Sequence, residues 1–196
     1  MLKTRIALAA LAAGTTSGAA HADVIYNFEG AVTSTNGSFF GTFGSVDIGE
    51  QVAFSVTIDS DPVSTSSTAF GYNVNASSLS IGGDRLDFVV GGTATVFNND
   101  AFVGDRFEGE VQDVEQFFEF RSLAAGNSLL TGTSLPTQTE LDGLLNFRGR
   151  YDFVDLFGGG QDSFFRVEFT NATVVPAPGS FATLTACGLL ARRRRR

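Results

Sequence analysis

Carboxylates are the side chains of this sequence that could carry out chemistry. Six of them lie between residues 105 and 119, namely Asp105, Glu108, Glu110, Asp113, Glu115 and Glu119. Two carboxylates that face each other across a cleft are the minimal apparatus for glycoside hydrolysis. The same residues also suit the solvated face of a β-strand, because alternate side chains of an extended chain point to opposite sides. We expect a protein that is not an enzyme, and we keep a carboxylate-pair glycoside hydrolase as the less favoured alternative.

Other catalytic side chains are missing from residues 23–173. This segment contains no His, Cys, Lys, Trp or Met, and the single histidine and cysteine of the sequence are His21 and Cys187. These absences exclude nucleophilic triads, Schiff-base chemistry and histidine-ligated zinc from the segment. A lone cysteine also excludes an intrachain disulfide. The glycines form neither a phosphate-binding loop nor a dinucleotide-binding fingerprint.

Two polar stretches have the residue types that coordinate calcium. Asp59 and Asp61 end one predicted strand, and Asn98, Asp100 and Asp105 lie in a later turn. Carboxylate and amide oxygens are the ligands that Ca²⁺ prefers. The EF-hand spacing is absent, and Asp and Asn are also ordinary turn residues. We therefore predict no cofactor, and we keep a calcium-dependent carbohydrate-binding module as the alternative function.

The charge of residues 23–173 bears on the partners. The segment has six arginines against all 21 acidic residues of the chain, which gives a formal charge of −15. Such a surface repels phosphates and anionic membranes, favours solubility and attracts cations. Nucleic acid is therefore not an expected partner.

Alternation of apolar and polar residues is the dominant pattern in this segment, and it must position any site. In residues 51–59 the apolar side chains Val52, Phe54, Val56 and Ile58 alternate with polar ones. Similar alternation starts near residues 24, 86, 118 and 165, and clusters of Gly, Asn and Asp separate the segments. The pattern predicts an all-β fold, a single antiparallel β-sandwich of jelly-roll type over residues 23–173.

At most one short helix is expected. Thr137 and Glu140 match the T-x-x-E capping box that starts helices, and leucines follow at helical spacing. Residues 61–69 are expected to form an exposed loop. The 19 phenylalanines of the segment supply the core, since each ring buries a large apolar area.

The first 22 residues predict a secretory signal peptide that forms an N-terminal helix. Lys3 and Arg5 precede the apolar run Ile6–Ala13, and Ala20 and Ala22 stand at the two positions that a signal peptidase reads. Export through the Sec translocon and cleavage after Ala22 are therefore expected.

The C-terminal segment, residues 174–196, has three parts in order. A proline-bounded motif is followed by an apolar stretch of 13 residues, Gly179–Ala191, and then by five arginines, Arg192, Arg193, Arg194, Arg195 and Arg196. Arginines resist translocation, so the arrangement predicts a stop-transfer signal. A helix of 13 residues is about 20 Å long, whereas the hydrocarbon core of a bilayer is about 30 Å thick.

Together with the N-terminal signal, these parts resemble the tail of PEP-CTERM proteins, bacterial exported proteins that an exosortase sorts. The motif here is the variant Val175, Pro176, Ala177 and Pro178, with Ala177 where the family usually has Glu. The resemblance implies that the tail acts as a transient anchor in the inner membrane and that an exosortase recognises the motif and cleaves at or near it. It also implies a non-catalytic protein of the cell envelope, displayed at the cell surface or in the extracellular matrix, and linked to exopolysaccharide and biofilm.

Overall fold

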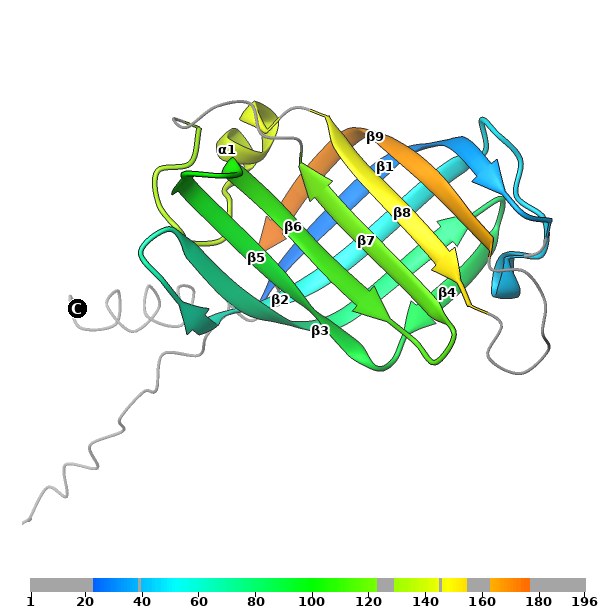
Figure 1. Ribbon diagram of the computed structural model, residues 1–196, viewed down its shortest axis with the longest axis horizontal. Coiled ribbons are helices and arrows are strands. Elements are labelled where there is room, and N and C mark those ends of the chain that lie inside the picture. The colour runs from blue at the N-terminus through cyan, green and yellow to red at the C-terminus, as the bar shows by residue number, and fades with distance from the viewer. Residues whose placement is uncertain (1–22, 39, 123–128, 145, 155–162, 177–196) are drawn as a thin grey trace, which may run out of the picture.

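The computed structural model describes residues 23–176 except residues 39, 123–128, 145 and 155–162. Within these ranges the chain forms nine β-strands, one short α-helix and one 3-10 turn (Figure 1). In chain order the elements are β1 (Val24–Asn36), η1 (Gly41–Phe43), β2 (Gln51–Thr65), β3 (Ala69–Ile81), β4 (Asp84–Phe88), β5 (Gly91–Asp100), β6 (Gly104–Gln112), β7 (Gln116–Ser122), α1 (Gln138–Gly143), β8 (Phe147–Phe153) and β9 (Ser163–Pro176).

The strands form one antiparallel sheet that closes into an eight-stranded barrel. Neighbouring strands follow the order β2-β1-β9-β8-β7-β6-β5-β3, and β2 pairs with β3 to complete the ring. The remaining strand, β4, pairs with the second half of β3, while β5 pairs with its first half. The prediction of a jelly-roll β-sandwich is therefore wrong, because the described strands make one closed barrel and not two facing sheets.

This error has a physical cause. A strand that is buried on one side shows the same alternation of side chains in a sandwich and in a barrel. The two folds differ in which strands pair, and closure here requires β1 to pair with β9 at the other end of the chain. The alternation itself is confirmed, because the four apolar residues predicted to point inward on β2 are all buried.

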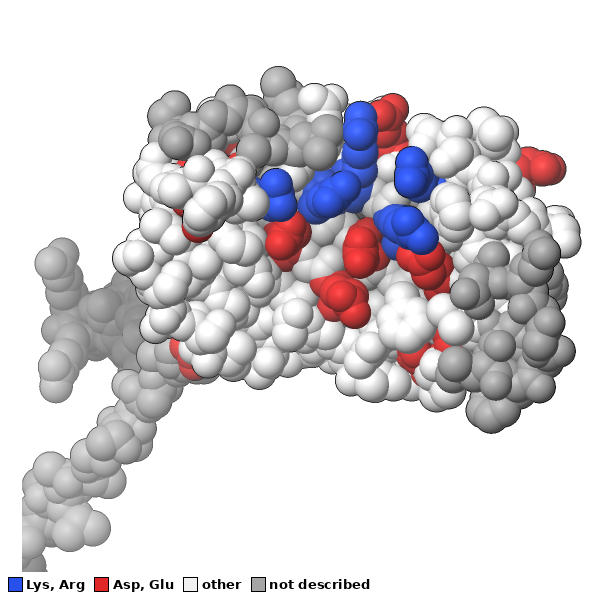
Figure 2. All heavy atoms as spheres, in the orientation of Figure 1, with Lys and Arg blue, Asp and Glu red and all other residues white. Residues whose placement is uncertain are grey.

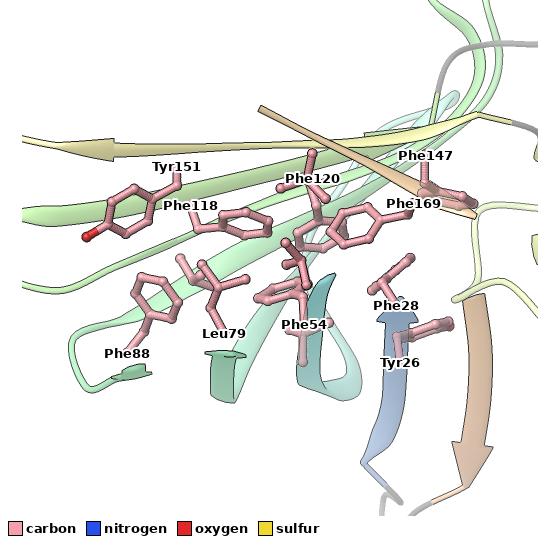
Figure 3. Packing of buried hydrophobic residues seen from close by; sticks show 14 of the residues in the cluster. Tyr26, Phe28, Phe54, Leu79, Phe88, Phe118, Phe120, Phe147, Tyr151 and Phe169 are labelled. Atoms are coloured by element: carbon pink, nitrogen blue, oxygen red, sulfur yellow. The ribbon is translucent and has the colours of Figure 1, made fainter. Parts of the chain in front are cut away.

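Aromatic side chains fill the barrel interior. The ring centroid of Phe28 lies 5.2 Å from that of Phe147, 5.4 Å from that of Phe169 and 5.9 Å from that of Phe54. Figure 3 shows rings from β7, β8 and β9 meeting those from β1 and β2 inside the barrel. An eight-stranded barrel has an interior just wide enough for side chains to fill, so these rings form the hydrophobic core.

Residues 129–144, which include α1, cover one end of the barrel (Figure 1). Two interior tyrosines reach this segment with their hydroxyl groups. Tyr26 Oη donates to the carbonyl of Pro136 at 2.8 Å, and Tyr72 Oη donates to the carbonyl of Thr133 at 2.7 Å. Burial raises the pKa of both tyrosines, because it disfavours the charged phenolate.

The predicted capping box is confirmed at the start of α1. Thr137 Oγ1 accepts a hydrogen bond from the Glu140 backbone N–H at 3.4 Å, and Glu140 Oε2 accepts one from the Thr137 backbone N–H at 2.9 Å. Glu140 Oε1 also accepts from the backbone N–H and the hydroxyl of Thr131. Partial burial acts to raise the pKa of Glu140, but the hydrogen bonds from Thr131 and Thr137 outweigh it and lower the value to about 2.

The described part of the segment between β1 and β2 closes the opposite end of the barrel. Phe40, Phe43 and Val46 are buried there against the core. The hydroxyl of Tyr151 lies 2.6 Å from Gln116 Oε1 and 3.0 Å from the carbonyl oxygen of Phe40. Each end of the barrel is thus tied to the interior by a buried tyrosine.

Residues 61–69 are mostly exposed, but they form a hairpin and not the predicted loop. Strand β2 continues to Thr65, and β3 begins at Ala69. The turn between them is held by Ser66, whose backbone N–H donates to the carbonyl of Ala69 at 2.8 Å. Polar composition predicted the exposure of this stretch, whereas its pairing depends on the partner strand.

Strands β1 and β9 bring the two ends of the described chain together. Val24 lies directly opposite Pro176 in their antiparallel ladder. The side chain of Gln138 in α1 holds the last part of β9, because its Oε1 accepts from the Val174 backbone N–H at 2.8 Å. The chain therefore enters and leaves the barrel at the same end.

Candidate functional site

Five of the six arginines of residues 23–173 lie on four neighbouring strands. They are Arg106 on β6, Arg121 on β7, Arg148 and Arg150 on β8, and Arg166 on β9. Their side chains point outward, because the alternate residues of the same strands are buried in the core. Figure 2 shows these cations gathered in the middle of one face of the molecule, with carboxylates between them.

Four of these residues, Arg121, Arg148, Arg150 and Arg166, form a block that we call the arginine face. Arg121 lies directly opposite Arg148 across β7 and β8, and Arg150 lies directly opposite Arg166 across β8 and β9. Residues that are directly opposite have Cβ atoms about 5 Å apart, and residues two apart along a strand are separated by about 7 Å. Two pairs of like charges therefore lie side by side.

Each pair contains one arginine that is held by a carboxylate. Arg148 Nη2 lies 3.3 Å from Glu168 Oε1. Arg150 donates from Nε to one oxygen of Asp152 at 2.7 Å and from Nη2 to the other at 2.6 Å, and this contact raises the pKa of Arg150. Among the described residues, the guanidinium groups of Arg121 and Arg166 have no hydrogen-bonded or ion-paired partner.

An aromatic ring supports one of the two pairs. The guanidinium carbon of Arg150 lies 4.5 Å from the ring centroid of Phe164, and that of Arg166 lies 5.7 Å from it. Cations are attracted to the face of an aromatic ring at such distances. Phe164 therefore holds both guanidinium groups close to the surface of β8 and β9.

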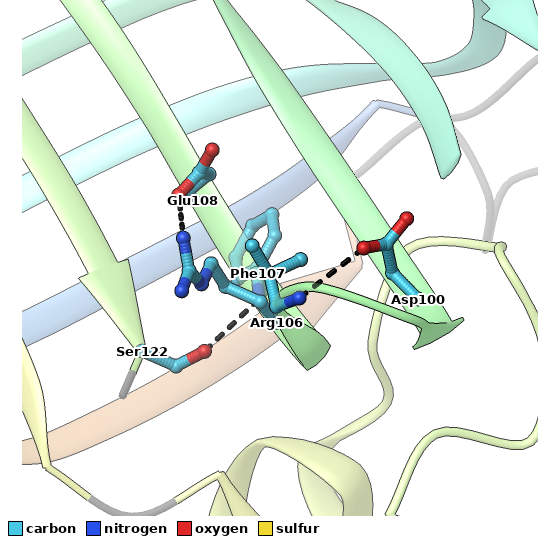
Figure 4. A network of polar contacts seen from close by, with 6 residues as sticks. Asp100, Arg106, Phe107, Glu108 and Ser122 are labelled. Carbon is cyan, nitrogen blue, oxygen red and sulfur yellow. Dashed lines mark hydrogen bonds and ion pairs between the residues drawn. The ribbon is translucent and has the colours of Figure 1, made fainter. Parts of the chain in front are cut away.

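Arg106 borders the arginine face but is already engaged. Its Nη1 lies 3.2 Å from Glu108 Oε2, as Figure 4 shows. The same view shows Ser122 Oγ accepting a hydrogen bond from the backbone N–H of Phe107 at 2.9 Å. Glu108 lies directly opposite Arg121, but its carboxylate pairs with Arg106.

A groove of about 450 Å³ runs over the arginine face. Besides the four arginines, its lining includes the carboxylates of Glu119 and Glu168 and the hydroxyl groups of Thr33 and Ser34 on β1. Ser34 lies directly opposite Arg166, and Glu119 lies directly opposite Arg150. The groove therefore offers cationic donors beside anionic and neutral acceptors.

This combination of side chains suits binding. A guanidinium group stays protonated at all ordinary pH values, so it cannot take up or release a proton in a reaction. Its planar array of five N–H donors matches the oxygens of carboxylates, sulfates and phosphates. The arginine face can thus bind an oxyanion, but its arginines cannot supply general acid or base catalysis.

The structure places the six carboxylates that suggested glycoside hydrolysis in three kinds of position. Asp105 is fully buried, whereas Glu108, Glu110 and Glu119 point outward, and Glu110 lies directly opposite Glu119 on the barrel surface. Asp113 and Glu115 belong to the turn between β6 and β7.

The five residues suggested for calcium fall on three strands. Asp59 and Asp61 lie on β2, Asn98 and Asp100 on β5, and Asp105 on β6. No group of three His, Cys, Asp or Glu side chains placed to hold a metal ion occurs in the described ranges.

Three of the five suggested calcium ligands are engaged by the backbone, and one of them, Asp59, accepts from the Asp61 N–H at 2.9 Å. Asp105 accepts hydrogen bonds from the N–H groups of Asn99, Leu129 and Leu130 at 2.7, 2.6 and 3.0 Å. Asp100 accepts from the Phe102 N–H at 2.9 Å, and its backbone and hydroxyl donors lower its pKa. A calcium site therefore stays a prediction.

The sorting motif is described in part. Val175 and Pro176 are the last residues of β9, and Val175 is 46% exposed. Ala177 and Pro178, the arginines at 192–196 and the cleavage positions Ala20 and Ala22 lie outside the described residues. Among the described residues, no helix is both long and apolar enough to cross a bilayer.

Sequence reasoning missed the arginine face. The spacing of Arg148 and Arg150 by two residues was the available signal, because it places both on one face of a strand. Arg121 and Arg166 join them only through the pairing of β7, β8 and β9. Comparison with protein-family models, curated proteins and solved structures found no match for this chain.

Proposed function

We propose that this chain is an exported, non-catalytic protein of the cell surface or extracellular matrix, sorted by an exosortase-type system. In this proposal the Sec translocon and a signal peptidase act first at the N-terminal segment. The exosortase then acts at the C-terminal motif while the tail holds the chain in the inner membrane. The barrel is the part that is displayed, and its setting is exopolysaccharide or biofilm.

One observation supports this proposal above the others: Val24 and Pro176 lie directly opposite each other in the barrel wall. The two segments that would be removed are therefore attached at the same end of the barrel. Their removal would take at most the last residues of β9 and would leave the closed ring of strands and its aromatic core in place. A displayed barrel would then point its opposite end away from the site of attachment.

A non-catalytic role is supported by the character of the surface groove. Its four cationic residues are arginines, which bind oxyanions but do not exchange protons at ordinary pH. The described barrel interior is packed with apolar and aromatic side chains. Display and binding are the activities that these features favour.

Mass spectrometry of the protein recovered from the cell surface tests the proposal. We expect a mature N-terminus at Asp23 and a C-terminus at or near residues 175–178. A double variant, Pro176→Ala with Pro178→Ala, should keep its tail and stay in the membrane fraction. As a matched control, Pro62→Ala removes an exposed proline of β2 and should be processed normally.

Two results would overturn the proposal. One is a surface-exposed protein that still ends at Arg196. The other is hydrolase activity of the purified chain that is lost in Glu110→Gln or Glu119→Gln.

A further inference from the structure

We propose that the arginine face binds the carboxylate groups of an acidic oligosaccharide, a glycan that contains uronic acid residues. This site goes beyond the proposed function, because it depends on the outer surface of β7, β8 and β9 and not on the fate of the tail.

The two arginine pairs are built alike. In each pair a carboxylate holds one member: Glu168 holds Arg148, and Asp152 holds Arg150. The opposite members, Arg121 and Arg166, line the groove and make no ion pair with a described residue, so no described carboxylate occupies their guanidinium donors. Each pair therefore contains one arginine that a carboxylate holds in place and one arginine without such a partner. Two neighbouring guanidinium groups can bind the two oxygens of a ligand carboxylate.

The arrangement brings like charges next to each other on neighbouring strands. Like charges directly opposite each other on neighbouring strands destabilise a sheet. Residues 23–173 contain six arginines and 21 acidic residues. Four of these six arginines nevertheless form two like-charged pairs. An anion bound between them would remove the repulsion.

The acidic side chains of the groove restrict the kind of anion. Glu119 and Glu168 line the groove, and Glu110 lies directly beside Glu119. These carboxylates repel a ligand with closely spaced charges, such as duplex nucleic acid or an anionic bilayer. They accept hydrogen bonds from uncharged hydroxyl groups, which sugars carry on most of their carbons.

The remaining wall of the groove is neutral and polar. Thr33 and Ser34 on β1 add two hydroxyl groups next to Arg166. The volume of about 450 Å³ lies within the range of about 300–1,000 Å³ that small-ligand sites occupy. The arginines of the groove can bind the acid groups of a sugar, and its carboxylates and hydroxyl groups can bind the sugar hydroxyls. The groove therefore matches an acidic sugar better than an inorganic anion.

Isothermal titration calorimetry with the full-length chain tests this site. The probes are tetrasaccharides of galacturonate, of mannuronate and of hyaluronan, and the methyl ester of the galacturonate probe. We expect saturable binding of at least one acidic probe, weakened by added salt, and no binding of the methyl ester.

Substitutions locate the site. Arg121→Gln and Arg166→Gln each remove an arginine that has no ion pair with a described residue. Both variants should keep the fold, and far-UV circular dichroism measures this. Each should weaken binding by about tenfold, because a charge-assisted hydrogen bond is lost. Arg85→Gln on β4, outside the groove, is the matched control and should bind as the unchanged chain does.

Four outcomes would overturn the inference. The first is no saturable binding of any acidic probe, and the second is equal binding by Arg121→Gln, Arg166→Gln and the unchanged chain. The third is displacement of the probe by inorganic sulfate at equal concentration, which would indicate a site for any oxyanion. The fourth is tighter binding of duplex DNA or of anionic vesicles than of every oligosaccharide.

Discussion

Gly109 on β6 lies directly opposite Phe120 on β7, and no side chain fits between them. A Cβ atom on Gly109 would lie 2.6 Å from two ring atoms of Phe120 and 2.8 Å from the backbone oxygen of Thr93. Phe120 has a second glycine, Gly149, directly opposite it on β8. A Cβ atom on Gly149 would meet other rings, at 2.5 Å from Phe118 Cζ and 3.1 Å from Phe169 Cε2. Both glycines therefore leave space that aromatic rings of the core occupy.

We predict that Gly109→Ala destabilises the barrel by about 1–3 kcal/mol, because neither a packed ring nor a backbone carbonyl can move aside without cost. The free energy of unfolding from urea denaturation measures the effect. Gly132→Ala is the matched control, since only the Ser134 hydroxyl lies within 4.0 Å of a Cβ there. The control should change the value by less than about 0.5 kcal/mol. Equal stabilities for the two variants would contradict the packing argument.

A second prediction concerns Asp105, whose buried carboxylate accepts three backbone N–H groups. Asp105→Ala should cost about 3 kcal/mol, because three backbone donors, that of Leu130 buried, lose their acceptor. Asp84→Asn, on an exposed position of β4, is the control and should change stability by less than about 0.5 kcal/mol.

The same residue allows a test of the calcium prediction. If Asp105 accepts hydrogen bonds from the backbone and binds no metal, calcium should not change the melting temperature of the unchanged chain. The reason is that a ligand stabilises only the state that it binds. A melting temperature that rises with calcium, and that no longer does so in Asp105→Asn, would instead make this carboxylate a metal ligand.

A third prediction follows from the lowered pKa of Glu140, which is about 2 in the folded chain against an ordinary value of 4.5. A carboxyl group whose pKa is lower in the folded state stabilises the fold above its unfolded pKa. That stability is lost as the pH falls from about 5 toward 2. Glu140→Gln should therefore cost about 1 kcal/mol at neutral pH and flatten the decline in stability over this range.

Urea denaturation at several pH values measures this dependence. Glu115→Gln, which changes a glutamate in the turn between β6 and β7, serves as the control and should retain the decline of the unchanged chain. If the stability of Glu140→Gln declined between about pH 5 and pH 2 as that of the unchanged chain does, the hydrogen bonds from Thr131 and Thr137 would not stabilise the ionised carboxylate.

A fourth prediction concerns the three tyrosines, which are all the tyrosines of the chain. Burial raises the pKa of Tyr26, Tyr72 and Tyr151 above the ordinary value of 10.0. A group whose folded pKa is raised stabilises the fold fully below its unfolded pKa, and this stability is lost as the pH rises. In an alkaline titration, tyrosinate absorbance should therefore appear together with the loss of far-UV circular dichroism. A phase of tyrosine ionisation near pH 10 with the barrel still folded would contradict this.

The alternation of side chains predicted much of the local structure. The inward positions on β1, β2, β7 and β9 follow from the sequence, because a strand with one buried face must alternate. The capping box at Thr137 and Glu140 could also be predicted from the sequence, because four consecutive residues determine it. The jelly-roll sandwich was wrong because alternation carries no information on strand partners.

The sequence alone determined the residue types, and with them the chemistry that residues 23–173 can perform. It excluded histidine, cysteine and lysine chemistry from this segment and supplied the aromatic core. Tertiary structure decided which strands pair, and so it decided that the sheet closes and that Val24 meets Pro176. It also decided that Arg121 and Arg166 join Arg148 and Arg150 on one surface. The reason is physical: pairing between strands far apart in the chain brings together residues whose proximity no local pattern encodes.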